Sequence, residues 1–367
     1  MAKQLIAHKK FIHIIYHPDL KFIPKFVERI NTHPDYFDAN DHLFVTKHKV
    51  IFDALKGFDN VELYSEKENP INKYGAYCDN LILHALPDKK MEIIKSKNKY
   101  LKKVIWRTWG HDAVKPNFDC GFIKGILKRI YWRAFSKKIK KFKMVAVANA
   151  IDEYAIKELF GKMKTCSLYY GANADDNLLP RLEEIAKNIS SNPQKPYRIL
   201  GSHSGSPTDN HIEVLDAFSN FRTENIKMCL ILSYGGTKEY YDKVVEYGKQ
   251  IYGEKLEIIS EKKSYFDYAS YIANVDLMVL NQKHSAGLGN FSLARHFSKP
   301  VVVNEQSPFA GLFKENGFEH YTLDKIKTLT FEQLCQIKLS DQIKNFFPPI
   351  YDGEQVLEIT KELFNSL

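Results

Sequence analysis

Short apolar or β-branched runs alternate with segments of helical spacing along most of the chain. The runs expected to form strands are KFIHIIYH (10–17), DHLFVTK, NLILHAL, KKVIWRTWG, MVAVAN, YRILGSHS, KMCLILSYG, KLEIIS, DLMVLN and PVVVNE. The segments between them, such as AIDEYAIKELFG (150–161), place apolar residues three and four positions apart and predict helices. Buried parallel strands read as continuous apolar runs joined by helices, so the pattern predicts an α/β fold with doubly wound parallel sheets.

The chain has 367 residues, which is too long for one ordinary hydrophobic core and enough for two. Its composition changes around residues 171–196, where GANADDNLLP and SSNPQKP are rich in Gly, Asn, Ser and Pro. We therefore predict a Rossmann-like domain over residues 1–175, a linker over 176–196, a second Rossmann-like domain over 197–345 and a C-terminal helix over 346–367. Two such domains facing each other would place ligands in the cleft between them, at the carboxyl ends of the strands.

Charge, hydropathy and cysteine spacing narrow the class of protein further. The formal net charge of +9 favours anionic partners, which include nucleic acid, acidic lipid and phosphorylated small molecules. No run of 18 or more uncharged apolar residues is present, and we interpret the N-terminal MAKQLIAHKKFIHIIYH as a first strand rather than a signal peptide. The five cysteines are scattered singly without a C-x-x-C pair, which favours a reducing, cytoplasmic environment and argues against a zinc site or a disulfide framework.

The segment LGSHSGSPTDNH (200–211) joins a predicted strand to a helix that begins near Asp209 or Asn210. Its small residues would let backbone N–H groups approach an anion such as a pyrophosphate, and the helix N-terminus adds partial positive charge. The spacing matches neither a Walker loop nor the dinucleotide fingerprint. An ordinary loop with a capping aspartate is the alternative interpretation. The residues predicted to contact the anion are Gly201, Ser202, Ser204, Gly205 and Ser206.

A second glycine-containing loop follows the predicted strand DLMVLN, in HSAGLGNFSLARHF (284–297). It again leads into a helix N-terminus, although a tight turn that requires positive φ would use the same residues. Lys283 and Arg295 are candidate cations for the same ligand. The residues predicted to bind the anion here are Gly287, Leu288, Gly289 and Asn290.

The predicted strand in VVVNEQSPF (301–309) ends at Asn304 and Glu305, and Pro308 stands where a helix would begin. Amide and carboxylate side chains at a strand end can hydrogen-bond ribose hydroxyls. The same side chains can also cap the helix that follows, so both interpretations remain open.

In the N-terminal half, WRTWGHD (106–112) brings a histidine and an aspartate to the carboxyl end of a strand. The first strand delivers His17 and Asp19 to the same edge, and another strand delivers His84. Asp, Glu and His are the usual general acids and bases, so Asp112 is the first candidate for a catalytic base, with Asp19 and His17 behind it. The alternative for each residue is a hydrogen bond to loop backbone.

No Asp or Glu occurs between Cys120 and Ile151, whereas nine Lys or Arg residues do. Apolar residues recur there at helical spacing, which we interpret as one apolar helical face. A basic amphipathic helix is typical of a membrane-surface element, and a solvated helix packed on its own sheet is the alternative. No helix-turn-helix or RNA-binding signature supports a nucleic-acid partner. The residues predicted to contact the membrane are Lys137, Lys138, Lys140 and Lys141.

Several of these segments, in this order, resemble bacterial TDP-N-acetylfucosamine:lipid II N-acetylfucosaminyltransferases, which act in enterobacterial common antigen assembly. The resemblance extends from the first strand to about residue 320 and is strongest in the second half. The family pattern has an Arg where Glu305 stands here and an acid where Gln306 stands. The segments that carry the resemblance are WRTWGHD, ILGSHSGSPTDNHIEVLDAF, IISEKKSYFDYASYIANVDLMVLNQ with HSAGLGN, and KPVVVNEQSPF.

This resemblance implies a GT-B glycosyltransferase with an acceptor-side N-terminal domain and a nucleotide-sugar-binding C-terminal domain. It also implies a nucleotide-sugar donor, no cofactor or essential metal, and a polyprenyl-diphosphate-linked acceptor at the inner face of the cell membrane. Two alternatives remain at this point: a sugar-nucleotide epimerase of the same architecture, and a non-catalytic scaffold for polysaccharide assembly.

Overall fold

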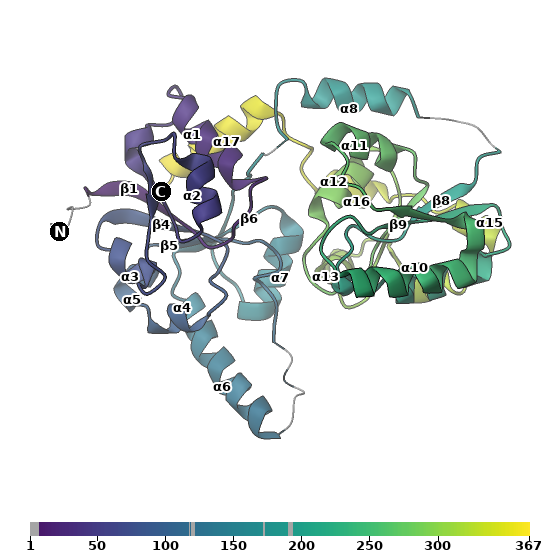
Figure 1. Cartoon of the computed structure of the whole chain (residues 1–367), viewed down its shortest axis with the longest axis horizontal. Coiled ribbons are helices and arrows are strands. Elements are labelled where there is room, and N and C mark those ends of the chain that lie inside the picture. Colours follow the sequence, from purple (N-terminus) through teal and green to yellow (C-terminus); the bar gives the residue numbers. More distant parts are fainter. Residues whose placement is uncertain (1–6, 117, 119–121, 172, 190–193) are drawn as a thin grey trace. The chain divides into compact units, whose positions relative to one another are not determined.

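Every strand pairing in the described part of the chain is parallel, as the alternating pattern predicts. The computed structural model describes residues 7–116, 118, 122–171, 173–189 and 194–367 (Figure 1). Two compact units divide the chain. The first comprises the chain up to Asp176 together with Tyr351–Leu367, and the second comprises Asn177–Ile350. The prediction of an α/β fold with doubly wound parallel sheets is confirmed.

The first unit is built on a seven-stranded sheet of order β3-β2-β1-β4-β5-β6-β7. Its strands are β1 (Lys9–Ile15), β2 (His42–Thr46), β3 (Val61–Leu63), β4 (Cys78–His84), β5 (Val104–Arg107), β6 (Met144–Val147) and β7 (Thr165–Ser167). Its helices are α1 (Ile23–Thr32), α2 (Lys49–Leu55), α3 (Pro70–Tyr74), α4 (Met91–Lys95), α5 (Asn98–Leu101), α6 (Phe122–Ile139), α7 (Ala150–Phe160) and α17 (Gly353–Asn365), with the 3-10 helix η1 (Ala39–Asp41). The strand order reverses between β1 and β4, and such a reversal is where ligands bind in open α/β sheets.

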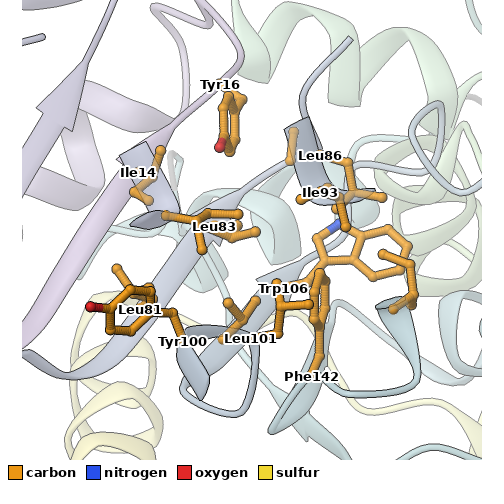
Figure 2. Close-up of a cluster of buried hydrophobic side chains, with 14 of the residues drawn as sticks. Ile14, Tyr16, Leu81, Leu83, Leu86, Ile93, Tyr100, Leu101, Trp106 and Phe142 are labelled. Carbon is orange, nitrogen blue, oxygen red and sulfur yellow. The ribbon is translucent and has the colours of Figure 1, made fainter. Parts of the chain in front are cut away.

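Helices cover both faces of this sheet. One face packs against α3, α4, α5, α7 and the C-terminal half of α6, and Figure 2 shows Leu83 and Trp106 within this core. The other face packs against α1, α2 and α17, and its core includes Phe26, Phe44 and Phe364. Burial on both faces explains why the central strands read as unbroken apolar runs in the sequence.

The second unit is built on a six-stranded sheet of order β10-β9-β8-β11-β12-β13. Its strands are β8 (Tyr197–Leu200), β9 (Ile226–Ile231), β10 (Leu256–Ile259), β11 (Leu277–Leu280), β12 (Val301–Val303) and β13 (Tyr321–Thr322). Its helices are α8 (Leu178–Lys187), α9 (His211–Ala217), α10 (Lys238–Tyr252), α11 (Tyr265–Ala273), α12 (Leu288–His296), α13 (Pro308–Glu315), α14 (Leu323–Ile326), α15 (Phe331–Cys335) and α16 (Asp341–Phe346), with the 3-10 helices η2 (Pro207–Asp209), η3 (Ser219–Phe221) and η4 (Gly253–Lys255). The strand order reverses between β8 and β11.

The chain returns to the first unit after residue 350. Helix α17 lies within the predicted C-terminal helix of residues 346–367 and is part of the first unit's core. A capping box starts it, because Asp352 accepts a hydrogen bond from the N–H of Gln355 while the Gln355 side chain accepts one from the N–H of Asp352. The predicted linker, residues 176–196, contains α8, which packs against α11 and belongs to the second unit.

Three histidines are buried side by side on the face of the first sheet that α1 and α17 cover. Nε2 of His13 lies 3.0 Å from Nδ1 of His42, and Nδ1 of His13 lies 3.0 Å from Nε2 of His84. Nδ1 of His84 lies 2.8 Å from the hydroxyl of Tyr170, which also accepts a hydrogen bond from Nε1 of Trp109 (2.9 Å). Burial lowers the pKa of His42 and of His84 from 6.5 to about 3, and burial also holds the pKa of His13 well below 6.5. The imidazoles are therefore neutral at physiological pH.

We predict that the free energy of unfolding falls as the pH is lowered below about 6.5. Unfolded histidines bind protons near pH 6.5, whereas the folded ones resist protonation down to about pH 3, so the unfolded state takes up more protons in this window and gains stability there. Denaturant unfolding at a series of pH values between about 7 and 5 measures this dependence.

In the same experiment, His42→Gln should reduce the slope of the free energy of unfolding against pH by the contribution of about one bound proton. His8→Gln is the control, because the His8 side chain is 60% exposed and lies outside the buried row, and it should reduce the slope less than His42→Gln does. A wild-type stability that is flat across this range would contradict the prediction.

Candidate functional site

The carboxyl ends of β8 and β11 form the switch point of the second sheet, where a ligand is expected in a doubly wound fold. The loop of residues 201–210 follows β8, and the loop of residues 281–287 follows β11. A methyl group built on Gly287 would lie 3.2 Å from Cγ of His203, so the two loops are in contact. The loops predicted to share one anion are therefore neighbours.

Serine side chains hold the loop after β8 in its own conformation. Ser202 Oγ accepts a hydrogen bond from a backbone N–H of β9 at 3.0 Å, and Ser204 Oγ donates to Oδ2 of Asp209 at 3.0 Å. Ser206 Oγ caps η2 by accepting from the N–H two residues on, at 3.3 Å. These three hydroxyls thus make the internal contacts that shape the loop.

The two glycines of this loop allow close packing against protein atoms. A Cβ on Gly201 would come within 2.8 Å of Leu230, and one on Gly205 within 2.5 Å of the Tyr241 ring. The N–H of Gly205 also donates to the carbonyl of Tyr234 at 2.7 Å. Their lack of side chains therefore serves the packing of the loop on its neighbours.

His203 is the residue of this loop that the sequence analysis missed. Its Nδ1 lies 3.0 Å from Oδ1 of the buried Asp209, at ion-pair distance but without the alignment of a hydrogen bond. The other oxygen of Asp209 accepts from the N–H of Ser204 at 2.9 Å, which fixes the carboxylate. The signal was present in the sequence, as an imidazole inside a Gly/Ser loop with an aspartate six residues on. An imidazole held on one side by a carboxylate can donate from its other nitrogen to a phosphate oxygen.

Helix α12 begins at the switch point without a side-chain cap. Its N-cap residue, Gly287, has a φ of +70°, which glycine adopts without steric cost. Leu288 and Gly289 follow in the first turn, and beyond that turn no heavy atom of the described chain lies within 4 Å of a Cβ built on Gly289. Asn290 is positioned by a hydrogen bond from its Nδ2 to the hydroxyl of Tyr268 at 2.7 Å. The uncapped turn presents backbone N–H groups and the positive end of the helix dipole, which favour an anion.

The two cations predicted beside this helix differ in their contacts. Lys283 is exposed on the loop after β11. Arg295 is buried, and its guanidinium donates to the carbonyls of Lys344 and Phe347, each at 3.0 Å, and to that of Pro348. Arg295 therefore links α12 to the C-terminal end of α16 and to the residues that follow it.

The loop after β12 also meets the switch point. Asn304 donates from Nδ2 to Oδ1 of Asn281 at 2.8 Å and accepts from the N–H of Gln306 at 2.9 Å. Glu305 is exposed and forms an ion pair with Lys314 of α13. Asn304 thus links the loops after β11 and β12, whereas Glu305 contacts the following helix.

In the first unit, Asp112 fastens the loops at the carboxyl ends of β4 and β5. Its Oδ2 accepts from the N–H of Leu86 at 2.9 Å and from Nε1 of Trp106 at 2.8 Å, and its Oδ1 accepts from the N–H of Trp109 at 2.8 Å. The residue is only 7% exposed. Three donors satisfy this carboxylate, which is the arrangement of an anchor for loop backbone, and its role as general base stays a prediction.

The backbone held by Asp112 is unusual. Ala85, directly after β4, has a φ of +69°, a conformation that non-glycine residues rarely adopt. Its N–H donates to the carbonyl of Arg107 at 3.1 Å, and the next N–H, that of Leu86, is the one bound by Asp112. Backbone of this kind persists only where its surroundings fix it, and it clusters at functional sites.

His17 follows β1 and lies against the loop after β5. Its imidazole stacks on Trp109, with ring centroids 5.1 Å apart, and lies 5.0 Å from the ring of His111. Its Nδ1 is buried and has no hydrogen-bond partner among the described residues. Burial and the neighbouring His111 lower the pKa of His17 below its usual 6.5, while Asp19 and Asp88 act in the opposite direction. A neutral imidazole with an unengaged nitrogen can accept a proton at physiological pH.

The other candidates from the first half have different surroundings. Oδ1 of Asp19 accepts from the N–H groups of Lys21 and Phe22, at 2.8 and 2.6 Å, just before α1. His84 lies in the buried histidine row and not at the exposed edge. Asp19, like Asp112, therefore holds loop backbone, whereas Nδ1 of His17 has no hydrogen-bond partner among the described residues.

Helix α6 has two apolar faces, so the prediction of a single apolar face is wrong. Phe135 and Ile139 are fully buried in the core of the first unit. Ile123 and Leu127 are 73% and 61% exposed. The helical spacing in the sequence grouped these residues on one face. The helix instead places the exposed pair and the buried pair on opposite sides. The start of the basic segment, residues 120–121, lies outside the described residues.

The four lysines predicted to contact a membrane are not equivalent. Lys138 Nζ donates to the carbonyl of Ser96 at 2.7 Å and to Oδ1 of Asn98 at 3.0 Å, so this side chain is engaged within the first unit. Lys137, Lys140 and Lys141 are exposed.

No group of three or more His, Cys, Asp or Glu residues in the described ranges could hold a metal ion. No helix within those ranges has the length and apolar character needed to cross a membrane.

Comparison with known proteins adds a family and a fold. A family model described as 4-alpha-L-fucosyltransferase, glycosyl transferase group 56, matches residues 87–361. The fold is similar to that of the Anabaena protein HepE, solved with UDP and glucose, at a TM-score of 0.58 and 13% identity over 98% of this chain and 100% of that one.

Two further structures share the architecture. A glycosyltransferase from Rickettsia africae has a TM-score of 0.54 at 13% identity, covering 98% of each chain. A putative UDP-N-acetylglucosamine 2-epimerase from Listeria monocytogenes has a TM-score of 0.51 at 12% identity, again covering 98% of each chain. The two parallel sheets and these similarities confirm the predicted fold class, GT-B with two Rossmann-like units.

We predict that Asp112→Asn lowers the free energy of unfolding by about 1–3 kcal/mol. The amide cannot accept from all three donors, so at least one buried N–H loses its partner. Denaturant unfolding measures the loss, and Asp19→Asn, at a partly exposed site, is the control with a smaller expected effect. Unchanged stability together with a loss of turnover of about a hundredfold or more would instead assign the general base to Asp112.

Proposed function

The chain belongs to the 4-alpha-L-fucosyltransferase family, group 56 of the glycosyltransferases, and from this premise we propose its substrates and the residues that act on them. As a glycosyltransferase, it forms a bond between an acceptor hydroxyl oxygen and the anomeric carbon of a donor sugar. We propose that the donor is a nucleoside-diphosphate sugar, with TDP or UDP as the nucleotide and a deoxy or amino sugar such as N-acetylfucosamine. HepE, which shares the fold, was solved with UDP and glucose, which supports this class of donor.

One observation carries the donor site: the uncapped N-terminus of α12 meets the loop after β8 at the switch point of the second sheet. The donor diphosphate would lie against the first turn of α12, where Gly289 leaves open space, with His203 beside it. As the bond to the anomeric carbon breaks, negative charge grows on the diphosphate, and N–H donors fixed in advance stabilise it. We propose that these groups, with Lys283 as a mobile cation, replace a metal ion.

The first unit would bind the acceptor and supply the base. We propose His17, because its partly exposed side chain follows β1 at the carboxyl edge of the first sheet and its pKa lies below 6.5. It would take the proton from the acceptor hydroxyl while the oxygen attacks the anomeric carbon and the nucleoside diphosphate leaves. Asp19 and Asp112 would hold the loops around it.

We propose that the acceptor is a polyprenyl-diphosphate-linked glycan used in bacterial surface polysaccharide assembly. The resemblance to lipid II-dependent transferases supports this class of acceptor, and the acid-free basic segment supports work at an anionic membrane surface. The enzyme would then act as a peripheral protein on the inner face of the cell membrane.

Donor binding provides the test. We predict that at least one sugar nucleotide from a panel of TDP- and UDP-sugars binds in calorimetry and is consumed only when an acceptor analogue is present. Gly289→Val should raise the dissociation constant about tenfold or more, since its side chain would fill the open space at the helix N-terminus. His203→Gln should weaken binding as well, through loss of the carboxylate-held imidazole.

Gly57→Val is the matched control, because Gly57 also has no atom of the described chain within 4 Å of a Cβ and lies in the first unit. It should leave donor affinity unchanged. Absence of any nucleotide binding would favour the scaffold, and release of an epimerised sugar nucleotide without acceptor would favour the epimerase.

The base has its own test. We predict that His17→Gln lowers kcat by about a hundredfold to ten-thousandfold while the donor dissociation constant stays the same. Wild-type kcat/KM should rise with pH and level off at a pKa below 6.5, because protonated His17 cannot accept the substrate proton. This limb should disappear in His17→Gln.

His111→Gln is informative as a comparison. His111 lowers the pKa of His17, so its removal should move the limb of the pH profile to higher pH. Turnover that is close to normal in His17→Gln would rule out the assignment.

A further inference from the structure

The N-terminal half of α6 exposes a row of large apolar side chains. Isoleucine and leucine side chains are usually buried, whereas four of them are exposed on this one 18-residue helix. We call them the outward stripe: Ile123 (73% exposed), Ile126 (40%), Leu127 (61%) and Ile130 (57%).

The outward stripe lies opposite the face that α6 packs on its own unit. At 3.6 residues per turn, residues 123, 126, 127 and 130 fall on one side, and Phe135 and Ile139, both fully buried, fall on the other. Figure 1 shows the N-terminal half of α6 extending away from the sheet of the first unit. The apolar residues of the stripe therefore do not pack in the hydrophobic core of the first unit.

Basic side chains border the stripe along its length. Helix α6 carries six Lys or Arg residues and no Asp or Glu. Lys124 lies on one side of the stripe, and Arg129 and Arg133 lie on the other, all three exposed. An apolar strip flanked by cations is complementary to a layer of anionic headgroups over hydrocarbon.

We propose that the outward stripe docks this protein on an anionic lipid bilayer, with its four apolar side chains inserted and the flanking cations among the lipid phosphates. The choice of a membrane rests on the proposed lipid-linked acceptor. A second copy of the chain is a poorer occupant, since it would bring two acid-free basic helices face to face. The contact thus lies at the N-terminal half of α6, away from Lys138, which is bound to Ser96 and Asn98.

Because apolar side chains would insert into the bilayer, salt should weaken the binding of the protein to vesicles only in part. Screening weakens the attraction of the cations, but it does not weaken the burial of the apolar side chains. Binding of the wild type to vesicles of phosphatidylcholine with phosphatidylglycerol should therefore fall at high salt and keep a measurable remainder. Vesicles of phosphatidylcholine alone should bind much less at low salt.

Double variants separate the contribution of the apolar side chains to vesicle binding from that of the cations. Ile123→Gln with Leu127→Gln should lower the partition coefficient about tenfold or more and remove the remainder at high salt. Lys124→Gln with Arg129→Gln should weaken binding only at low salt. Val50→Gln with Leu63→Gln is the matched control, because both residues are 49% exposed on the same unit, and it should change nothing.

A fluorescence readout tests insertion directly. In Leu127→Trp, the added tryptophan should shift its emission to the blue and be quenched by lipids brominated in the acyl chain. Leu63→Trp, at a position of the same unit that is 49% exposed, should show neither change.

Sugar transfer to a water-soluble acceptor analogue distinguishes a failure of the docking surface from a failure of the proposed function. Normal transfer by Ile123→Gln with Leu127→Gln, together with lost vesicle binding, supports the docking surface. Vesicle binding by a protein that transfers no sugar to any acceptor would reject the proposed function and keep the surface. The proposal is overturned if the wild type ignores anionic vesicles, if the stripe variant binds them normally, or if ultracentrifugation shows a dimer that the stripe variant dissociates.

Discussion

Parallel pairing makes every strand of a sheet point the same way, so the loops that leave the carboxyl ends must gather along one edge. In each unit the strand order also reverses once, and at that point two loops diverge to opposite faces and leave room between them. The loops after β1 and β4 meet this condition in the first unit, and the loops after β8 and β11 meet it in the second. The positions of His17 and of the α12 N-terminus follow from this constraint.

A buried aspartate stabilises the loops at each of the two edges. Asp112 accepts hydrogen bonds from the backbone of the loops after β4 and β5, and Asp209 accepts one from the backbone of the loop after β8. Asp112 follows His111 in the sequence, and Asp209 lies at ion-pair distance from His203. A carboxylate suits this place because it accepts several N–H bonds at once and is costly to bury without them. Loops fixed in this way can present functional groups without rearranging when a ligand binds.

The sequence predicted the sheets well, because continuous apolar runs specify buried parallel strands. It missed the short β3, β7 and β13, because their residues, VEL, TCS and YT, include polar ones and form no apolar run. At the candidate site it pointed to the loops at the switch point, but it could not show which of their atoms are already engaged. Ser204 and Gly205 have the types expected of a phosphate loop, yet their contacts are internal, and only tertiary structure shows that Tyr241 fills the space beside Gly205. Asp112 is a similar case, because its three donors lie up to 26 residues from it in the chain.

Helix α17 makes the second unit an insertion within the first. The polypeptide leaves the first unit at residue 176 and comes back at 351, and Phe364 then covers Phe11 and His42 in the first sheet. During synthesis on the ribosome, the second unit can therefore complete its core while the first still waits for the helix that closes one face. Until α17 arrives, His13 and His42 lack the ring of Phe364 that covers them. The first unit thus begins to fold before the second unit and completes its core after it. In the interval, a chaperone could bind the apolar face that α17 later covers.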